Sequence, residues 1–216
     1  MGLLLLYSYT ILSLSLSLSL SLNMLLQDRH PHPWGMAVAK TSSFFITERL
    51  QLAVAATVYQ GTIDLGAYVD AGDAQGLAIE SVDFIWQGHN TSTDVWSNPG
   101  GALSGNATLA AQLMSNNANT AMIPANDHRL IASGEVYYDN TNEIVSVATD
   151  MFPDNFGKGD QSYYVVNDQL YLVAAASGTR AANNVIEVTA RIRCRIVKLQ
   201  QKDWMSIALQ QTAQDN

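Results

Sequence analysis

The sequence has little charge and a single cysteine. Charged residues make up 14% of its 216 residues, against about 25% in ordinary soluble proteins. Its 15 Asn and 13 Gln residues therefore predict a surface covered mainly by amides and hydroxyls. The lone Cys194 excludes an intramolecular disulfide framework and a multi-cysteine zinc or iron–sulfur site. Hydrophobic residues reach 48%, which is enough for a core and excludes a highly charged disordered chain.

The first 26 residues carry no charged side chain, and residues 13–22 alternate strictly between Ser and Leu. This stretch is long enough to cross about 30 Å of hydrocarbon as a helix, but it lacks the basic region and small-residue cleavage site of a secretory signal. A repeated two-base unit such as TC, read in triplets, also encodes Ser and Leu in alternation. We therefore interpret residues 1–35 as a low-complexity hydrophobic leader and linker over a mis-assigned start, with Met36 as the first residue. A signal, a membrane anchor and a genuine low-complexity tail are the alternatives.

Residues 36–216 are predicted to form one all-β domain, because their apolar residues recur at every second position. The longest run, residues 185–199, places Ile, Val, Ala and Cys on one face and Glu, Thr and Arg on the other. Cys194 lies in the apolar row and is expected to be a buried small hydrophobe. In the run 77–86 the apolar positions change from odd to even near Glu80 and Ser81, which predicts a bulge or a strand break.

Turn-rich segments separate these runs. Residues 70–76 and 138–143 are rich in Asp, Asn and Gly and predict turns, the second of them inside a hairpin. Short strands without βαβ alternation indicate an antiparallel sandwich or barrel of about eight to ten strands. One or two short helices are expected, with residues 108–115 and 47–58 as candidates because of their helix-like apolar spacing. Residues 94–126 are interpreted as a surface excursion, and residues 200–216 as a strand end or an exchanged arm.

The motifs of catalysis are missing. The sequence contains no G-x-S-x-G, no G-x-x-x-x-G-K-[ST] and no H-E-x-x-H. His89 and His128 lie far apart and are expected to be surface or hydrogen-bonded polar residues. Glycoside hydrolysis by a pair of carboxylates from separate strands stays open as an alternative, because the distance between the two groups cannot be read from the sequence. We predict a protein that is not an enzyme, with no catalytic residue and no cofactor.

Acidic residues cluster in three loops, but none has the D-x-[DN]-x-[DN]-G spacing of a specific calcium loop. Turn formation on a solvated surface is the preferred interpretation, and no metal site is predicted. Two sequons match the glycosylation pattern, which matters only in a secreted eukaryotic protein. The acidic clusters are Asp70 with Asp73, Asp139 with Glu143, and Asp150 with Asp154 and Asp160; the sequons start at Asn90 and Asn106.

Charge is distributed unevenly along the chain. Residues 50–179 contain 14 acids and two bases, whereas residues 180–216 contain six bases and three acids. Arginines at every other position of the last long run lie in a row on one face of a strand. Two interpretations stay open: acidic strands of the same domain pair with this row, or the row is a basic interface to another subunit, to nucleic acid or to anionic headgroups. The candidate interface residues are Arg191, Arg193, Arg195 and Lys198.

Three strand-like segments, together with a short Ala/Thr/Ser lead and a long Gly/Asn/Ala-rich excursion, carry a resemblance to a known family. They are residues 62–69, 79–86 and 191–199. Over about 80% of its length, the chain resembles the single jelly-roll capsid proteins of viruses, although no family signature motif is present. The resemblance implies two four-stranded sheets, assembly of many copies into a shell, and no catalysis.

The chain departs from this family in lacking a basic N-terminal arm, since residues 36–49 contain only Lys40 and Arg49. The departure argues against direct nucleic-acid contact. It suits a shell laid over an internal viral membrane, or one that uses a second capsid protein or a separate nucleic-acid-binding protein.

The leading hypothesis is therefore a structural virion protein whose jelly rolls self-assemble into a capsid through lateral contacts. The alternative is a secreted or surface β-sandwich module that binds carbohydrate or acts as an adhesin. Its stacking platforms would be Trp86, Trp96, Tyr137 or Tyr138.

Overall fold

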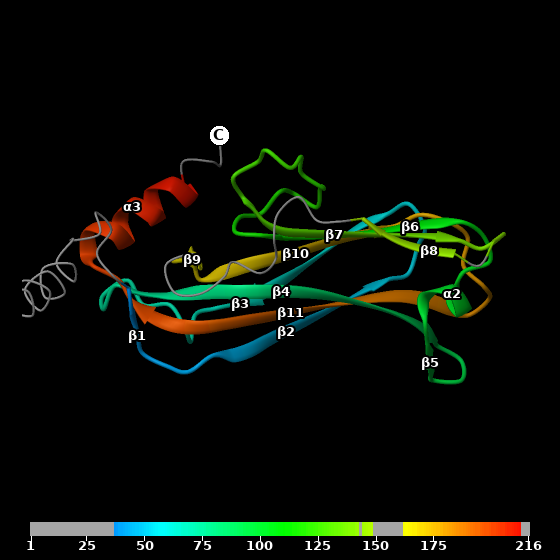
Figure 1. Cartoon of the computed structure of the whole chain (residues 1–216), viewed down its shortest axis with the longest axis horizontal. Helices are drawn as coiled ribbons and strands as arrows, with labels where there is room; N and C mark the ends of the chain where they lie inside the picture. Colours follow the sequence, from blue (N-terminus) through cyan, green and yellow to red (C-terminus); the bar gives the residue numbers. More distant parts are fainter. Residues whose placement is uncertain (1–36, 143, 149–161, 213–216) are drawn as a thin grey trace, which may run out of the picture. The chain divides into compact units, whose positions relative to one another are not determined.

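The computed structural model describes residues 37–142, 144–148 and 162–212, and these described residues belong to one compact unit. Two antiparallel sheets face each other as layers of a sandwich (Figure 1). Sheet A contains β1 (Val38–Ala39), β2 (Phe44–Leu52), β4 (Gln75–Asn90), β5 (Val95–Ser97), β9 (Tyr163–Val165) and β11 (Asn184–Lys198). Sheet B contains β3 (Val58–Asp64), β6 (Ala107–Met114), β7 (Leu130–Asp139), β8 (Ile144–Ala148) and β10 (Gln169–Ala176). The helices are α2 (Pro99–Ala102) and α3 (Gln201–Thr212).

The strands pair in a nested order that defines the fold. β2 pairs with β11, β3 with β10, β4 with β9, and β6 with β7, as in one long hairpin folded back on itself. Two further pairings, β11 with β4 and β10 with β6, roll this hairpin into two four-stranded sheets. The orders β2-β11-β4-β9 and β3-β10-β6-β7 are those of a jelly roll. The predicted all-β jelly-roll sandwich is thus confirmed, with β1, β5 and β8 as additional strands in the described part of the chain.

The core lies between the inner faces of the two sheets and divides into two clusters. Leu52, Leu109 and Ile186 belong to one cluster, and Leu113 and Ile192 belong to the other; all five are fully buried. Each such side chain contributes about 1.5–3 kcal/mol through its removal from water. Alternation along the strands therefore determines which face of each sheet is buried.

The change of apolar face in β4 arises from a β-bulge. Ser81 lies opposite Arg193 and Ile79 lies opposite Cys194, so Glu80 is an extra residue in β4 without a register partner. The sequence predicted a bulge or a strand break at this position, and the structure has the bulge. The β7–β8 hairpin and the turn before β4 also lie where their Asx and Gly residues predicted them.

Both segments favoured as helices are strands instead. Residues 108–115 fall almost entirely in β6, and residues 47–58 are the second part of β2, a turn and the start of β3. The error has a simple cause, because Leu109 and Leu113 are four residues apart, a spacing shared by one helical turn and by two strand repeats. Burial of Ala111 between them fits only the strand.

The excursion at residues 94–126 was also misinterpreted. It includes β5, α2 and the core strand β6. After β6 the chain folds over the outer face of sheet B, where Ala118 and Ile123 pack against Met114 and Val173. The Gln112 side chain holds this loop: its Nε2 donates to the Ile123 carbonyl and its Oε1 accepts from the Ile123 amide, both at 2.8 Å.

The C-terminal segment forms helix α3 rather than a strand end. Trp204 and Ile207 pack against Ala78, Val197 and neighbouring apolar residues, and the Trp204 indole N–H donates to the Gln75 carbonyl at 3.3 Å. A search of the described residues finds no helix with the length and apolarity needed to span a membrane. The leader, residues 1–35, lies outside the described residues.

Candidate assembly surface

The outer face of sheet A brings together most of the predicted interface residues. On β11 the odd positions 191–195 point away from the core, while Ile192 and Cys194 between them are fully buried. The register places Arg191 between Thr47 of β2 and Asp83 of β4. We call this surface the arginine face. It consists of Phe45, Thr47, Arg49, Asp83, Ile85, Arg191, Arg193 and Arg195.

Lys198, the fourth predicted interface residue, lies elsewhere. It is exposed at the end of β11, and strand alternation directs it to the opposite side from the three arginines. Its charge acts on Asp73, whose pKa is lowered first by a hydrogen bond from Lys40 and then by the charge of Lys198. Lys198 therefore belongs to a second, smaller group of charges beside the turn before β4.

Two of the arginines share one carboxylate. Arg193 Nε lies 3.0 Å from Glu80 Oε2, and Arg195 Nη1 lies 3.3 Å from Glu80 Oε1. The Ser43 hydroxyl donates to the same carboxylate at 2.8 Å. Glu80 is the bulged residue of β4, so the irregularity in the strand places this acid between two bases. In this group two positive charges thus meet one negative charge.

Arg191 contacts an aromatic ring instead. Its guanidinium carbon lies 4.7 Å from the centroid of the Phe45 ring, which is 52% exposed. A cation–π contact at such an exposed site contributes about 0.5–1 kcal/mol. Ile85, on the same face, is also partly exposed. Arginine and aromatic side chains together are enriched at protein interfaces.

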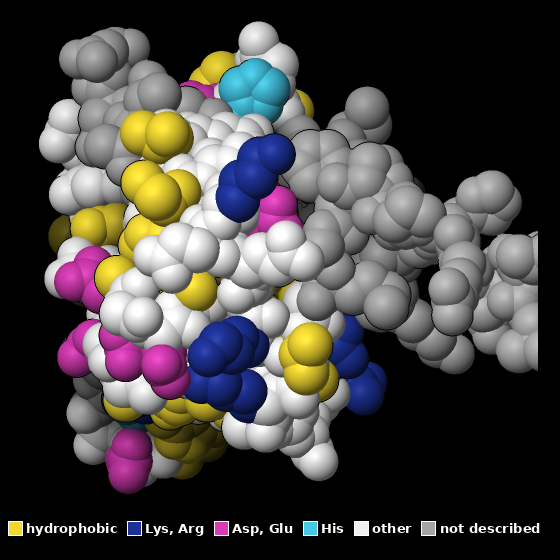
Figure 2. Space-filling view, turned by 90° about the vertical axis from the view of Figure 1, so that its left-hand side faces the viewer, with side chains coloured by type: hydrophobic (Ala, Val, Ile, Leu, Met, Phe, Trp, Pro, Cys, Tyr) yellow, Lys and Arg dark blue, Asp and Glu magenta, His cyan; other side chains and the backbone are white. Residues whose placement is uncertain are grey.

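The strand charges are divided between the two sheets. Every Lys and Arg on the described strands belongs to sheet A, in β2 and β11. Sheet B strands carry only acids, namely Asp64, Glu135 and Asp139. The strands of sheet A also carry four acids, Glu48, Glu80, Asp83 and Glu187, so their five bases leave a net charge of about +1, whereas the described strands of sheet B carry three acids and no base. Viewed from the α3 end, basic side chains form small groups with acidic ones beside them, on a surface that is otherwise largely uncharged (Figure 2).

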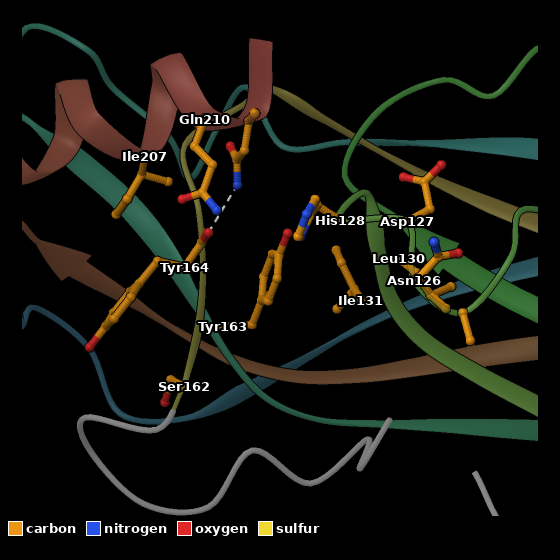
Figure 3. Close-up of a pocket in the computed structure, with 12 residues that line it drawn as sticks. Asn126, Asp127, His128, Leu130, Ile131, Ser162, Tyr163, Tyr164, Ile207 and Gln210 are labelled. Carbon is orange, nitrogen blue, oxygen red and sulfur yellow. Dashed lines mark hydrogen bonds between the residues drawn. The ribbon is translucent and has the colours of Figure 1, made fainter. Parts of the chain in front are cut away.

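A pocket of about 540 Å³ lies between α3, β9 and the loop before β7 (Figure 3). Leu130, Ile131 and Ile207 form its apolar lining, and His128 and Tyr163 also line it. Beside it, the Asp127 carboxylate binds Arg129 at 2.7 Å, and this contact lowers the Asp127 pKa. Burial raises the pKa of Tyr163. The acid next to His128 is thus engaged by a base, and burial favours the neutral form of the tyrosine.

Cys194 is the buried small hydrophobe that its position in the apolar row predicted. Its side chain has no exposed surface, and burial raises the pKa of its thiol to about 12. The Sγ atom lies 3.8 Å from the Phe44 carbonyl oxygen. A thiol in this environment remains protonated at neutral pH and is a poor nucleophile.

The acidic loops form turns, as the sequence analysis favoured. Asp70 Oδ1 accepts from the Gly72 amide at 2.8 Å, and Asp139 Oδ1 accepts from the Thr141 amide at 3.0 Å. Among the described residues no group of three or more His, Cys, Asp or Glu side chains is arranged to hold a metal ion. Glu143 and the third cluster, Asp150, Asp154 and Asp160, lie outside the described residues.

The four aromatic residues considered as sugar platforms do not form one surface. Trp86 and Tyr138 pack against the core. Trp96 lies on β5 of sheet A with His89 stacked on its ring, and Tyr137 lies on β7 of sheet B. The structure therefore does not assemble these side chains into a shared stacking platform.

No family model and no curated protein matches the sequence. Comparison with solved structures finds similarity to viral capsid proteins. VP1 of trichodysplasia spinulosa-associated polyomavirus, in complex with GM1 oligosaccharide, has a TM-score of 0.41 and 8% identity, covering 76% of this chain and 97% of that one. The unassembled VP1 pentamer of KI polyomavirus has a TM-score of 0.36 and 9% identity, with coverages of 77% and 99%. The structure of Desmodium yellow mottle tymovirus has a TM-score of 0.29 and 10% identity, and the match covers 74% of this chain and 90% of that one.

These scores are too low to bear on function. The jelly-roll assignment rests instead on the nested strand pairing of this chain. The chain has the fold that viral capsid domains share with lectin domains and cupins.

Proposed function

We propose that this chain is a structural virion protein that self-assembles into a capsid shell through contacts between its jelly-roll sandwiches. A fold by itself does not assign a function. The observation that carries the proposal is the unequal charge of the described strands: their bases all lie on sheet A, beside four acids, whereas the strands of sheet B carry acids and no base. The role is structural and requires no catalytic residue or cofactor.

Such a molecule can bind copies of itself through two different surfaces. The arginine face of one copy meets the acidic outer side of sheet B, with Glu135 and Asp139, on the next copy. A contact between unlike surfaces is heterologous, and it produces rings or closed shells when the rotation between copies closes. Charged groups cost free energy when they lose water at an interface, and the low overall charge keeps this cost small at each repeated contact.

The proposal is tested on the full chain by light scattering after size exclusion and by negative-stain microscopy. Rings, shells or oligomers of defined size are expected, and they should weaken as salt is raised from 0.05 to about 0.5 M because exposed charge contacts are screened. A chain that stays monomeric up to millimolar concentration would contradict self-assembly.

The contacts of the two bases in residues 36–49 bear on whether the chain binds the genome directly. Lys40 binds Asp73 at 3.3 Å, and Arg49 binds Glu187 at 3.3 Å. Residues 36–49 contain only these two bases, and each faces an acid of the same domain, which supports the expectation that this stretch does not neutralise nucleic acid. We accordingly propose that the genome is contacted by a second protein, or is separated from this shell by an internal membrane.

A further inference from the structure

His89 joins two parts of the chain through both of its ring nitrogens. It is the second-last residue of β4, and its Nδ1 lies 3.0 Å from Glu187 Oε1 on β11. Its Nε2 lies 2.9 Å from Asp94 Oδ1, in the turn between β4 and β5. The ring also stacks on Trp96 of β5, with centroids 4.2 Å apart and an angle of 3° between the planes. We call these four residues the His89 cluster.

Both hydrogen bonds require a positively charged ring. Ionised carboxylates only accept hydrogen bonds, so each ring nitrogen must carry a proton for both contacts to form. A neutral imidazole has one N–H and would turn a lone pair toward the other carboxylate at about 3 Å. The charged groups that contact this ring or its partners are Asp94 from the turn, Glu187 from β11 and Arg49 from β2.

The free-energy cost of breaking the hydrogen bond to His89 differs between the two carboxylates. The Glu187 side chain is 3% exposed, and its Oε1 depends on His89 for a donor while its Oε2 has only the ion-pair contact with Arg49 at 3.3 Å. The Asp94 side chain is 87% exposed and can be hydrated instead. Leaving a buried carboxylate without a donor costs far more than exposing one that water already reaches. A neutral His89 therefore keeps the proton on Nδ1, for Glu187, and gives up the one on Nε2.

We propose that the protonation state of His89 controls whether Asp94, in the turn of the β4–β5 hairpin, is held by the histidine ring. With a doubly protonated ring, Asp94 is held at the turn of the hairpin. With a neutral ring, Asp94 is released while the Glu187 contact remains, and the hairpin is held by the pairing of β5 with β4 without the Asp94 contact. Loss of the charge also weakens the stack, because an imidazolium is attracted to the face of an indole more strongly than a neutral ring is. The hairpin carries the exposed apolar residues Val95 and Trp96, so its release changes a surface at one end of sheet A. This inference does not depend on the proposed capsid role.

Amide hydrogen exchange of the full chain tests the proposal, with rates corrected for the intrinsic effect of pH. Histidine is the side chain that ordinarily changes charge between pH 5 and 8. Protection of residues 91–97 is expected to fall about three- to tenfold between pH 5.5 and 8, given the usual strengths of exposed ion pairs and cation–π contacts. Protection of β11 around Glu187 should stay constant over this range.

Two variants locate the effect. His89→Gln should remove the pH dependence of residues 91–97. Asp94→Asn should do the same without disturbing the fold, since Asp94 is exposed and has a φ of 55°, which asparagine tolerates. His128→Gln, which removes a histidine from the pocket beside α3, is the matched control and should retain the wild-type profile.

Three results would overturn the proposal. One is equal protection of the hairpin at pH 5.5 and 8 in the wild type. Another is an unchanged pH dependence in Asp94→Asn. The third is a loss of protection around Glu187 rather than in the hairpin, which would mean that the buried contact breaks first.

Discussion

Glu80 and Arg193 form an ion pair of 3.0 Å that exists because β4 has one residue more than its partner strand. Without the bulge, position 80 would occupy a regular place in the ladder between Ile79 and Ser81 and would point to the core. The extra residue instead places the carboxylate on the outer face, within reach of both Arg193 and Arg195. The backbone irregularity and the charge arrangement are thus one feature.

Replacing Glu80 with Gln should destabilise the domain by about 1 kcal/mol, a modest value because Arg193 is half exposed and solvent screens the pair. Urea denaturation at low protein concentration measures the effect. Glu135→Gln is the control, since Glu135 is an exposed acid of β7 that lies outside the group formed by Glu80, Arg193 and Arg195. A loss no larger than in the control would show that the shared carboxylate does not stabilise the fold.

Replacing Arg191, Arg193 and Arg195 together with Gln should raise the concentration at which oligomers form by about tenfold or more, and should reduce their salt dependence. Sedimentation velocity over a range of salt concentrations measures both effects. Among single changes, Arg191→Gln should weaken assembly more than Lys202→Gln, which removes an exposed charge from α3. If oligomers of the triple variant persist at every salt concentration, the arginine face is not part of the interface.

How far the sequence predicts this fold depends on the range of the contacts involved. The run 185–199 predicted β11, which spans residues 184–198, and the shift of apolar positions predicted the bulge, because strand alternation is a local property. The same local signal could not separate helix from strand in β6, where the apolar spacing fits both. Helix α3 did have a signal, since Trp204, Ile207 and Ala208 follow helical spacing, but the many Gln residues around them obscured it.

The arrangement of the charges depends on contacts that are distant in sequence. The row of arginines at positions 191, 193 and 195 was visible in the sequence. Its acceptor, Glu80, was not, because Glu80 reaches the row only through the antiparallel pairing of β4 with β11. His89 and Glu187 are 98 positions apart, and no pattern near either residue indicates the other. Strand register, which is determined by the whole sheet, brings such pairs together.

Cys194 should make the stability of the domain depend on alkaline pH. Burial raises the pKa of its thiol from an ordinary value of 9.0 to about 12 in the folded state. Below pH 9 the thiol is protonated in both states and contributes no pH dependence. Above pH 9 the unfolded chain loses the proton first, so the free energy of unfolding falls as pH rises, by about 1.4 kcal/mol at pH 10.

The comparison of wild type with Cys194→Ala isolates this effect, because lysines and tyrosines titrate equally in both proteins. The difference in unfolding free energy between them should shrink as pH rises from 8 to 10. The native thiol should also resist modification by a soluble disulfide reagent until the protein is unfolded. Rapid labelling of the folded protein would contradict the buried position of Cys194.

Gln112 should be essential to the loop that covers the outer face of sheet B. Its amide satisfies both the N–H and the carbonyl of Ile123, and the side chain is 8% exposed. Gln112→Leu keeps the volume but leaves two buried backbone groups without partners, at a cost of about 1–3 kcal/mol for each unsatisfied group. We expect a loss of about 2–4 kcal/mol in urea denaturation, together with faster amide exchange at Ile123. Gln51→Leu, at an exposed position of β2, should change stability by less than about 0.5 kcal/mol. Equal effects of the two changes would mean that water replaces Gln112 and that the loop is held by the packing of Ala118 and Ile123 alone.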